Sequence, residues 1–193
     1  GAQACNPKIG QWRELIAALK GLPADVQLTR LNKAINRMAR YTDDTKAFGK
    51  KDHWATPAEF LKGQGDCEDF ATIKYRSLLE LGFSDEQLRL AVVRDTRRGI
   101  LHAVVTVTTD DRTLVLDSLF DHVVEQRHVL KYVPVYSANQ GEQFAHIVTK
   151  ALRLAYLDHV ENQARNQAAK ASSIMPPGIE PDSRKTPKFV DWT

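Results

Sequence analysis

The hydrophobic pattern changes its period once near the middle of this chain, and this change limits the folds available to it. Residues 66–81 carry apolar side chains at helical spacing and are followed by Gly82, a common helix stop. Three runs of β-forming residues come next, and they cover 88–94, 101–108 and 113–118. Polar turn segments separate them at 97–99 and 110–111. A helix followed by an antiparallel meander predicts an α+β fold.

Helices are also expected on both sides of this core. Apolar stripes predict a helical N-terminal part over about residues 8–42, and the polar residues 42–53 predict a loop. A further extended run is expected at 129–135. The apolar stripe at 144–155 predicts a last helix, with helix-compatible sequence up to about residue 171.

The end of the chain differs in composition from the rest. After Ser172, four prolines exclude regular structure, so residues 172–193 are expected to form an extended tail. Residues 1–171 are expected to form one domain with its core at about 54–160. The chain begins with Gly1, which is typical of a processed end, so any export signal is expected to have been removed.

Composition excludes several classes of protein. The 193 residues include 27 Lys and Arg against 24 Asp and Glu, so the formal net charge is only +3. A surplus this small and scattered does not predict nucleic-acid binding. The sequence has no apolar run long enough to cross a bilayer, so a membrane-spanning protein is not expected. The two cysteines, Cys5 and Cys67, allow at most one disulfide and form no zinc motif, and Cys5 is expected to remain unpaired.

The most informative segment surrounds the second cysteine and reads Gly63-Gln64-Gly65-Asp66-Cys67-Glu68-Asp69-Phe70. Asp66 can cap the following helix, which places Cys67 in its first turn. The partial positive charge and free N–H groups of a helix start favour the thiolate over the thiol. The position therefore favours Cys67 as a nucleophile, and a buried, inert cysteine is the alternative.

The strands that follow carry two candidate partners for the cysteine. His102 lies near the start of the 101–108 run, and Asp117 lies near the end of the 113–118 run. With a turn centred on 110–111, the two side chains become diagonal neighbours, and a turn shifted by one residue pair places them directly opposite; in both cases they share one face of the hairpin. His102 can then take the thiol proton while Asp117 orients its ring. The alternatives are a histidine of the core or surface and an aspartate that merely ends a strand.

Acidic residues crowd the cysteine, and they are Asp66, Glu68 and Asp69. Their negative charge opposes a thiolate, whereas a bound Ca²⁺ would neutralise it and suits oxygen ligands. The alternative is a helix-capping role for Asp66 and Asp69. Gln64 or the backbone N–H of Cys67 could donate a hydrogen bond to a developing oxyanion, and Trp54 could pack over the cleft.

These motifs resemble those of the bacterial transglutaminase-like cysteine proteinases. The likeness rests on GDCEDFA at 65–71, WATPAEFL at 54–61 and HAVVTV at 102–107. It runs from about Trp12 to residue 160 and leaves the proline-rich tail unmatched. It implies a papain/transglutaminase-like core, with a catalytic cysteine at a helix start packed against an antiparallel sheet that carries the histidine and the aspartate. It also implies a calcium ion near the cysteine.

The resemblance further implies a triad of Cys67, His102 and Asp117 and a particular biology. Adhesin-releasing members of the family are periplasmic and cut the N-terminal region of a giant biofilm adhesin after paired alanines, which disperses the biofilm. An inner-membrane receptor that responds to cyclic di-GMP holds them inactive. On this resemblance we expect a periplasmic endopeptidase with these two partners.

Three functions are compatible with these residues. In an endopeptidase, Cys67 attacks a peptide carbonyl to form a thioester that water releases, with His102 as the base. If an amine receives the same acyl group, the protein is a transglutaminase or an amidase. The third possibility, from a different class, is an inactive binding module. Iodoacetamide labelling of Cys67 separates the binding module from the enzymes.

Overall fold

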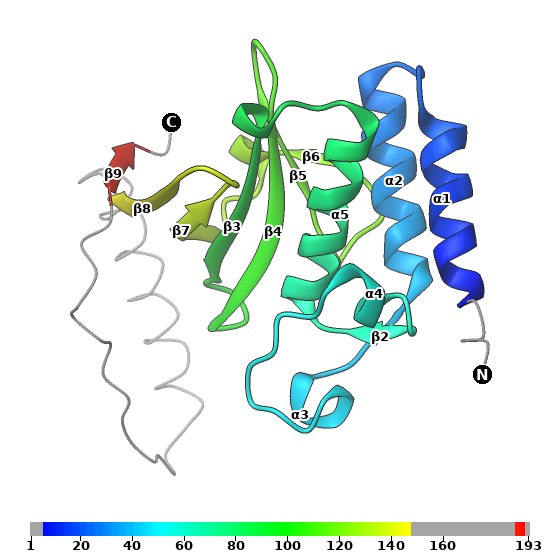
Figure 1. Ribbon diagram of the computed structural model, residues 1–193. Coiled ribbons are helices and arrows are strands. Elements are labelled where there is room, and N and C mark those ends of the chain that lie inside the picture. The colour runs from blue at the N-terminus through cyan, green and yellow to red at the C-terminus, as the bar shows by residue number, and fades with distance from the viewer. Residues whose placement is uncertain (1–5, 148–187, 192–193) are drawn as a thin grey trace.

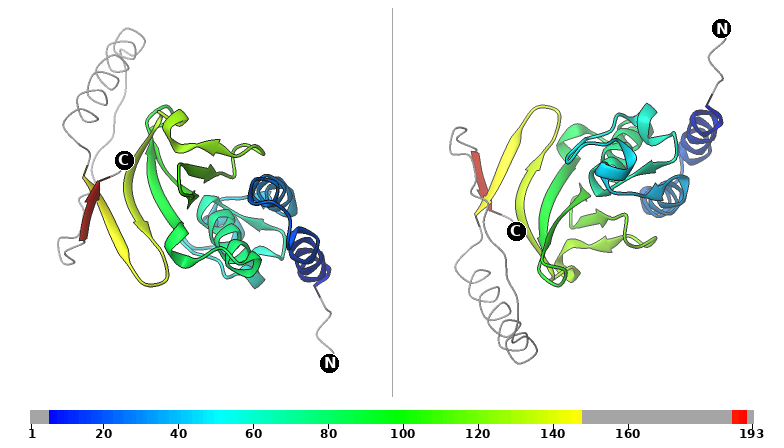
Figure 2. Two further views of the ribbon diagram at one scale, coloured as in Figure 1. Left: turned by 90° about the horizontal axis from the view of Figure 1, so that it is seen from above. Right: turned by 90° about the horizontal axis from the view of Figure 1, so that it is seen from below.

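Helices and strands occupy two separate layers (Figure 1). The computed structural model describes residues 6–147 and 188–191. Its α-helices are α1 (Pro7–Leu19), α2 (Ala24–Met38), α3 (Asp44–Ala47), α4 (Pro57–Phe60) and α5 (Cys67–Leu81). Views from above and below show these helices gathered on one face of the main sheet (Figure 2). None of the described helices combines the length and the apolar character needed to cross a membrane.

Seven of the described strands form that sheet, in the spatial order β6-β5-β4-β3-β7-β8-β9. Their bounds are β3 (Leu88–Asp95), β4 (Ile100–Thr108), β5 (Thr113–Leu116), β6 (Val124–Glu125), β7 (Tyr132–Ala138), β8 (Gln143–Ile147) and β9 (Lys188–Asp191). Neighbouring strands are antiparallel except β8 and β9, which run parallel. The short strands β1 (Arg40–Tyr41) and β2 (Gln64–Gly65) form a separate parallel pair. The predicted α+β fold is confirmed.

Helix α5 joins the two layers. The helix predicted over 66–81 is confirmed to within one residue, and Gly82 ends it in the left-handed conformation with a φ of 98°. At its start, the Asp69 carboxylate accepts a hydrogen bond from the backbone N–H of Asp66 at 3.2 Å. Its buried apolar residues include Phe70, Ile73, Leu78 and Leu81. Burial of each contributes roughly 1.5–3 kcal/mol, so this face holds the cysteine end of the helix in place.

Alternate residues of β4 enter two different cores. Ala103, Val105 and Val107 pack with the helices in the main core. Val104 faces the other way and joins a second cluster, whose other buried members are Ala91, Val93, Val115 and Val129. Because side chains alternate along a strand, His102 shares the face of Val104.

The hairpin of β4 and β5 has the predicted register. Val105 pairs with Leu116, as expected for a turn centred on 110–111. Continued by one pair, this register places Val104 opposite Asp117. His102 lies two residues before Val104, so it is a diagonal neighbour of Asp117 on the same face of the sheet. The turn thus determines which side chains meet at the far end of the hairpin.

The helix predicted over 144–155 is wrong where the structure describes it. Residues Gln143–Ile147 form β8 and pair antiparallel with β7. Between the two strands, Asn139 accepts hydrogen bonds from the backbone N–H groups of Gly141 and Glu142, which makes a tight turn. The turn returns the chain alongside β7, and this pairing overrides the helical spacing. The rest of the predicted helix, up to residue 171, lies outside the described residues.

Three smaller corrections concern segments predicted to be irregular or extended. The run predicted at 129–135 begins later, because residues Gln126–His128 form a 3-10 turn before β7. The expected polar loop contains the short helix α3. The predicted irregular tail contributes β9, since an extended segment can satisfy its backbone by adding to the edge of a sheet.

Candidate active site

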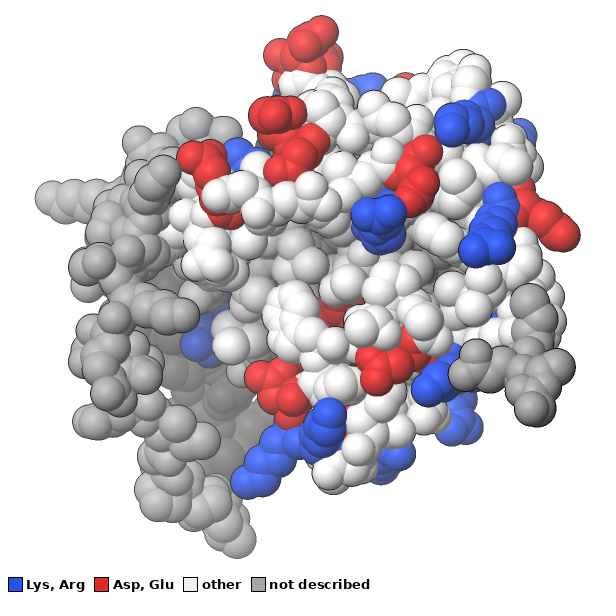
Figure 3. Space-filling view, viewed as in Figure 1, with Lys and Arg blue, Asp and Glu red and all other residues white. Residues whose placement is uncertain are grey.

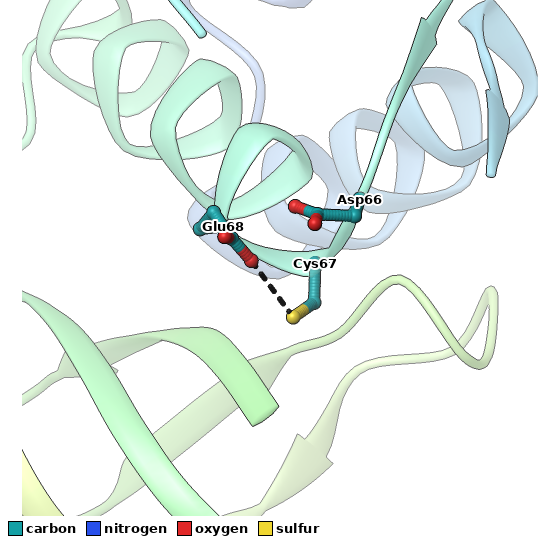
Figure 4. A group of neighbouring side chains, drawn as sticks. All are labelled: Asp66, Cys67 and Glu68. Atoms are coloured by element: carbon teal, nitrogen blue, oxygen red, sulfur yellow. Dashed lines mark hydrogen bonds between the residues drawn. The ribbon is translucent and has the colours of Figure 1, made fainter. Parts of the chain in front are cut away.

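Cys67 opens helix α5 and is a free, partly buried cysteine. Its thiol donates a hydrogen bond to Glu68 Oε2 at 3.1 Å, and the sulfur points away from the helix (Figure 4). Burial, followed by the hydrogen bond and charge of Glu68, raises the pKa of the thiol to about 12. The backbone N–H of Ala103 also bonds the sulfur and acts in the opposite direction. In this arrangement the sulfur is a protonated thiol.

His102 and Asp117 form a buried pair at the start of β4 and the end of β5. The distance from His102 Nε2 to Asp117 Oδ1 is 2.7 Å, and the residues are 2% and 0% exposed. Burial alone raises the pKa of Asp117, but the hydrogen bonds that it accepts, first from His102, outweigh burial and lower it. An ionised carboxylate at Nε2 places the ring proton there and leaves Nδ1 to accept another proton.

Tyr132, the first residue of β7, completes this pair and was not predicted. Its hydroxyl donates to Asp117 Oδ2 at 2.5 Å, and the backbone N–H of Leu119 donates to Asp117 Oδ1 at 2.9 Å. The Tyr132 ring lies 5.7 Å from the His102 ring, measured between centroids. The sequence holds no local signal for this contact, because it depends on the pairing of β7 with β3.

The structure brings the cysteine to the strand that carries the histidine. Ala103, whose N–H bonds the Cys67 sulfur, directly follows His102 in β4. Within the described residues, the thiol donates its hydrogen bond to Glu68 and not to His102. The predicted pair of His102 and Asp117 is thus formed, while transfer of the thiol proton to His102 requires Glu68 to release the thiol.

The acidic cluster is larger than the sequence indicated. Potential ligand atoms lie within 4.8 Å of one another in three overlapping groups, which are Asp66–Cys67–Glu68, Asp44–Asp66–Asp69 and Asp44–Asp52–Glu68. Asp44 in α3 and Asp52 after it were not predicted, because only the folded chain brings them to α5. Figure 4 shows the carboxylates of Asp66 and Glu68 together at the start of the helix, with the Cys67 sulfur directed away from the helix.

Two carboxylate oxygens of this cluster are buried without a hydrogen-bond partner in the described structure, and they are Asp44 Oδ1 and Asp66 Oδ1. Burial, followed by the neighbouring Glu68, raises the pKa of Asp66 to about 9. Crowded, unpaired carboxylate oxygens fit a divalent cation that prefers oxygen ligands. Asp69 differs, since its two oxygens accept hydrogen bonds from the backbone N–H groups of Ala55 and Asp66, so it also has the capping role considered above.

Gln64 and Trp54 lie beside the cysteine segment. The Gln64 side-chain amide donates to the Ala47 carbonyl at 3.1 Å and so ties β2 to the end of α3. Its role at an oxyanion stays a prediction. Trp54 is 48% exposed and precedes Ala55, which is bound to Asp69, so its ring is available at the surface near the start of α5. It is not a core residue.

Tyr41 in β1 is a further neighbour of the sulfur that was not predicted. It pairs with Gly65, and its ring stacks on Phe70 with centroids 6.4 Å apart. Burial, then the charges of Cys67 and Asp66 and a hydrogen bond to Cys67, raises the pKa of Tyr41. The phenol is therefore a permanent hydrogen-bond donor next to the thiol.

A free cysteine at a helix start, beside a buried histidine–aspartate pair on an antiparallel sheet, defines this site as that of a cysteine proteinase of the transglutaminase-like class. The sequence matches the family described as bacterial transglutaminase-like cysteine proteinase over residues 3–151, and the chain belongs to that family. Solved structures add a particular relative, LapG of Legionella pneumophila. Comparison with curated proteins gives no match.

The likeness to LapG covers most of both chains. One structure of it is 30% identical, with a TM-score of 0.66 over 81% of this chain and 87% of LapG. A calcium-bound LapG is 30% identical, with a TM-score of 0.66 over 82% of this chain and 90% of LapG. An EGTA-treated LapG is 29% identical, with a TM-score of 0.67 over 81% and 88%. The predicted family and fold are confirmed.

Proposed function

We propose that the protein is a calcium-dependent cysteine endopeptidase in which Cys67, His102 and Asp117 act together. The observation that carries the proposal is the buried hydrogen bond of 2.7 Å between His102 and Asp117, formed next to Ala103, which contacts the sulfur. The Asp117 carboxylate fixes the tautomer of His102 with the ring proton on Nε2. The unprotonated Nδ1 can then act as the base that accepts the proton of a nearby thiol.

The chemistry begins with transfer of the Cys67 proton to His102 Nδ1. The sulfur then attacks the carbonyl carbon of a peptide bond, and negative charge develops on the carbonyl oxygen. The backbone N–H of Cys67 at the helix start and the hydroxyl of Tyr41 are donors available for this charge. The imidazolium returns its proton to the departing amine, and a thioester remains. Water, deprotonated by His102, releases the acyl group and restores the thiol.

Asp117 stabilises the imidazolium that forms in both steps. Its carboxylate is fully buried and remains ionised, because its hydrogen bonds lower its pKa despite burial. The charge therefore acts on the His102 ring at short range and without competition from solvent. Replacement of this carboxylate removes both the orientation of the ring and the stabilisation of its charge.

The carboxylates beside the cysteine would hold the calcium ion, and these are Asp44, Asp52, Asp66, Glu68 and Asp69. When bound, the ion supplies positive charge that offsets theirs and favours a thiolate. Glu68 accepts the thiol hydrogen bond and also belongs to the acidic cluster, so this residue connects the metal site to the nucleophile. The calcium-bound form of LapG supports this part of the proposal.

The substrate is proposed to be an extended segment in the N-terminal region of a large surface adhesin, cut after paired alanines in the periplasm to release the adhesin and disperse the biofilm. An inner-membrane cyclic di-GMP receptor is proposed as the inhibitory partner. Family membership and the likeness to LapG support both partners. Exposed apolar side chains near the site suit an extended segment with small side chains, and they include Tyr41, Trp54, Leu101 and Leu119.

The test is a cleavage assay on a peptide that contains paired alanines, with calcium present. Replacement Cys67→Ala is expected to abolish cleavage and leave the fold unchanged, because the sulfur supplies the attacking electrons. The matched control Cys5→Ser is expected to cleave at the rate of the unmodified protein. Cleavage by Cys67→Ala would refute the triad.

The same preparation decides between peptide hydrolysis and acyl transfer. Mass spectrometry of a glutamine peptide incubated with a primary amine reveals any amide product, which hydrolysis does not give. A Cys67 that does not react with iodoacetamide, measured in the Cys5→Ser background, would instead favour a binding function.

A further inference from the structure

We propose that Tyr132 is a positioning residue for the reaction, holding the Asp117 carboxylate in the one orientation that serves His102. The inference rests on the proposed function, since it concerns the histidine–aspartate pair of that site. Tyr132 lies in β7, far from the cysteine in sequence, and contacts the two residues of the pair at once.

The two oxygens of Asp117 have different partners. Oδ1 accepts two hydrogen bonds, from His102 Nε2 at 2.7 Å and from the Leu119 backbone N–H at 2.9 Å. Oδ2 accepts the Tyr132 hydroxyl at 2.5 Å, and the described residues provide it with no second hydrogen bond. Because Asp117 is fully buried, loss of this donor leaves Oδ2 without a hydrogen-bond partner and removes the contact that fixes the carboxylate.

The backbone of Asp117 is held independently of its carboxylate. The Asn36 side-chain amide in α2 donates to the Asp117 carbonyl at 3.0 Å and to the Phe120 carbonyl at 3.1 Å. With the main chain fixed in this way, the remaining freedom of Asp117 is rotation of its side chain. The Tyr132 hydroxyl opposes that rotation by holding Oδ2, while His102 bonds Oδ1.

The phenol of Tyr132 is a donor throughout the working pH range. Burial, followed by the hydrogen bond and charge of Asp117, raises its pKa above the ordinary value. Charged groups around the pair are Asp95, Arg98 and Lys131 beside Tyr132 and the buried Lys74 facing Asp117. Asp95 forms ion pairs with Arg98 at 2.9 Å and with Lys131 at 3.7 Å. The Tyr132 hydroxyl therefore donates its hydrogen bond to Asp117, while Asp95 is paired with Arg98 and Lys131.

The test compares Tyr132→Phe with Tyr136→Phe, which removes a hydroxyl from the same strand away from Asp117. Calcium-loaded protein labelled with ¹⁵N-histidine is examined by NMR, and His102→Ala identifies the Nε2–H signal of His102. We expect Tyr132→Phe to broaden or shift this signal and to slow iodoacetamide alkylation of Cys67 about tenfold, equivalent to one hydrogen bond. Tyr136→Phe is expected to leave both unchanged.

The outcomes separate this inference from the proposed function. If the Tyr132 hydroxyl does not position Asp117, Tyr132→Phe changes at most the melting temperature while the His102 signal and the alkylation rate stay as they were, and the inference is overturned. If His102→Ala itself alkylates at the original rate, the proposed triad fails. Phenylalanine keeps the ring that packs on His102, so the fold is retained in the decisive variant.

Discussion

Neighbouring groups act in opposite directions on the pKa of the Cys67 thiol. The helix start and the N–H of Ala103 favour a thiolate, whereas burial and Glu68 raise the pKa of the thiol to about 12. At neutral pH a thiol with a pKa this high is almost entirely protonated. Nucleophilic attack therefore requires the charge around Glu68 to change. The unpaired oxygens of Asp44 and Asp66 mark where a cation would make that change.

The crowded carboxylates around Cys67 predict that cleavage depends on calcium. EGTA is expected to abolish cleavage, and added Ca²⁺ to restore it. Replacement Asp44→Asn should weaken calcium binding about tenfold or more, as measured by isothermal titration calorimetry, because it removes charge from two of the ligand groups. The neighbouring Asp43→Asn is the control, since Asp43 is exposed and its side chain makes no capping hydrogen bond to α3. Equal affinities of the two variants would place the ion elsewhere.

Lys74 predicts a pH dependence of stability. It is buried in α5, and its Nζ has no hydrogen-bond partner in the described structure. Burial lowers its pKa from 10.5 to about 7, and the charges of Asp117 and Asp121 only partly oppose this. The unfolded chain therefore binds more protons than the folded one between these two values, so the free-energy cost of burying this lysine falls as the pH rises from about 7 to 10.5.

The measurement is urea unfolding of Lys74→Met and of the unmodified protein at a series of pH values. Below pH 7 the variant is expected to be the more stable, because the buried charge is gone. Its advantage should shrink above that pH by up to about 1.4 kcal/mol per unit. The exposed Lys62→Met serves as the control, and its difference from the unmodified protein should not vary with pH. A constant difference for Lys74→Met would contradict a neutral lysine.

At the scale of the elements, local patterns predicted the parts whose contacts are local. Helix α5 has helical spacing and a glycine stop, and the turn at 110–111 determined the register that joins His102 to Asp117. The roles of Tyr132 and Asp44 could not be predicted from local patterns. Tyr132 reaches the site through the pairing of β7 with β3, and Asp44 reaches it because α3 lies near the start of α5 in the folded chain. The sequence predicts a helix where β8 forms because the apolar residues of this segment also fit a helical stripe.

The junction of β2 and α5 tolerates no side chain at Gly65. A Cβ atom there would lie 2.7 Å from Asp69 Oδ2 and 3.1 Å from the Phe60 ring. Gly65→Ala is therefore expected to destabilise the protein by about 1–3 kcal/mol and to displace Asp69 from the helix start. Gly10→Ala, in the open interior of α1, should instead stabilise it by about 1 kcal/mol. Chemical denaturation measures both, and a Gly65→Ala protein as stable as the original would show that the junction can relax.

Over the whole molecule, the chemistry sits where the helical layer meets the sheet. The cysteine belongs to the helical layer, and its proposed base belongs to the sheet, so the relative placement of the two layers sets the geometry of the site. Lys and Arg are interspersed with Asp and Glu on the face shown, and neither sign dominates it (Figure 3). With a net charge of +3, attraction of a substrate by the overall field is weak, and recognition depends on contacts near the site.

The parallel pairing of β9 with β8 has a consequence for how copies of the protein meet. At the other border of the described sheet, β6 is only two residues long, so it has few backbone groups that could pair with a strand of another molecule. Without residues 188–191, β8 would present unpaired backbone amide and carbonyl groups at the edge of the sheet. Such an edge can pair with a strand of another molecule. With β9 in place, the border strand on this side of the described sheet is only four residues long, and a short edge strand limits pairing with a second molecule.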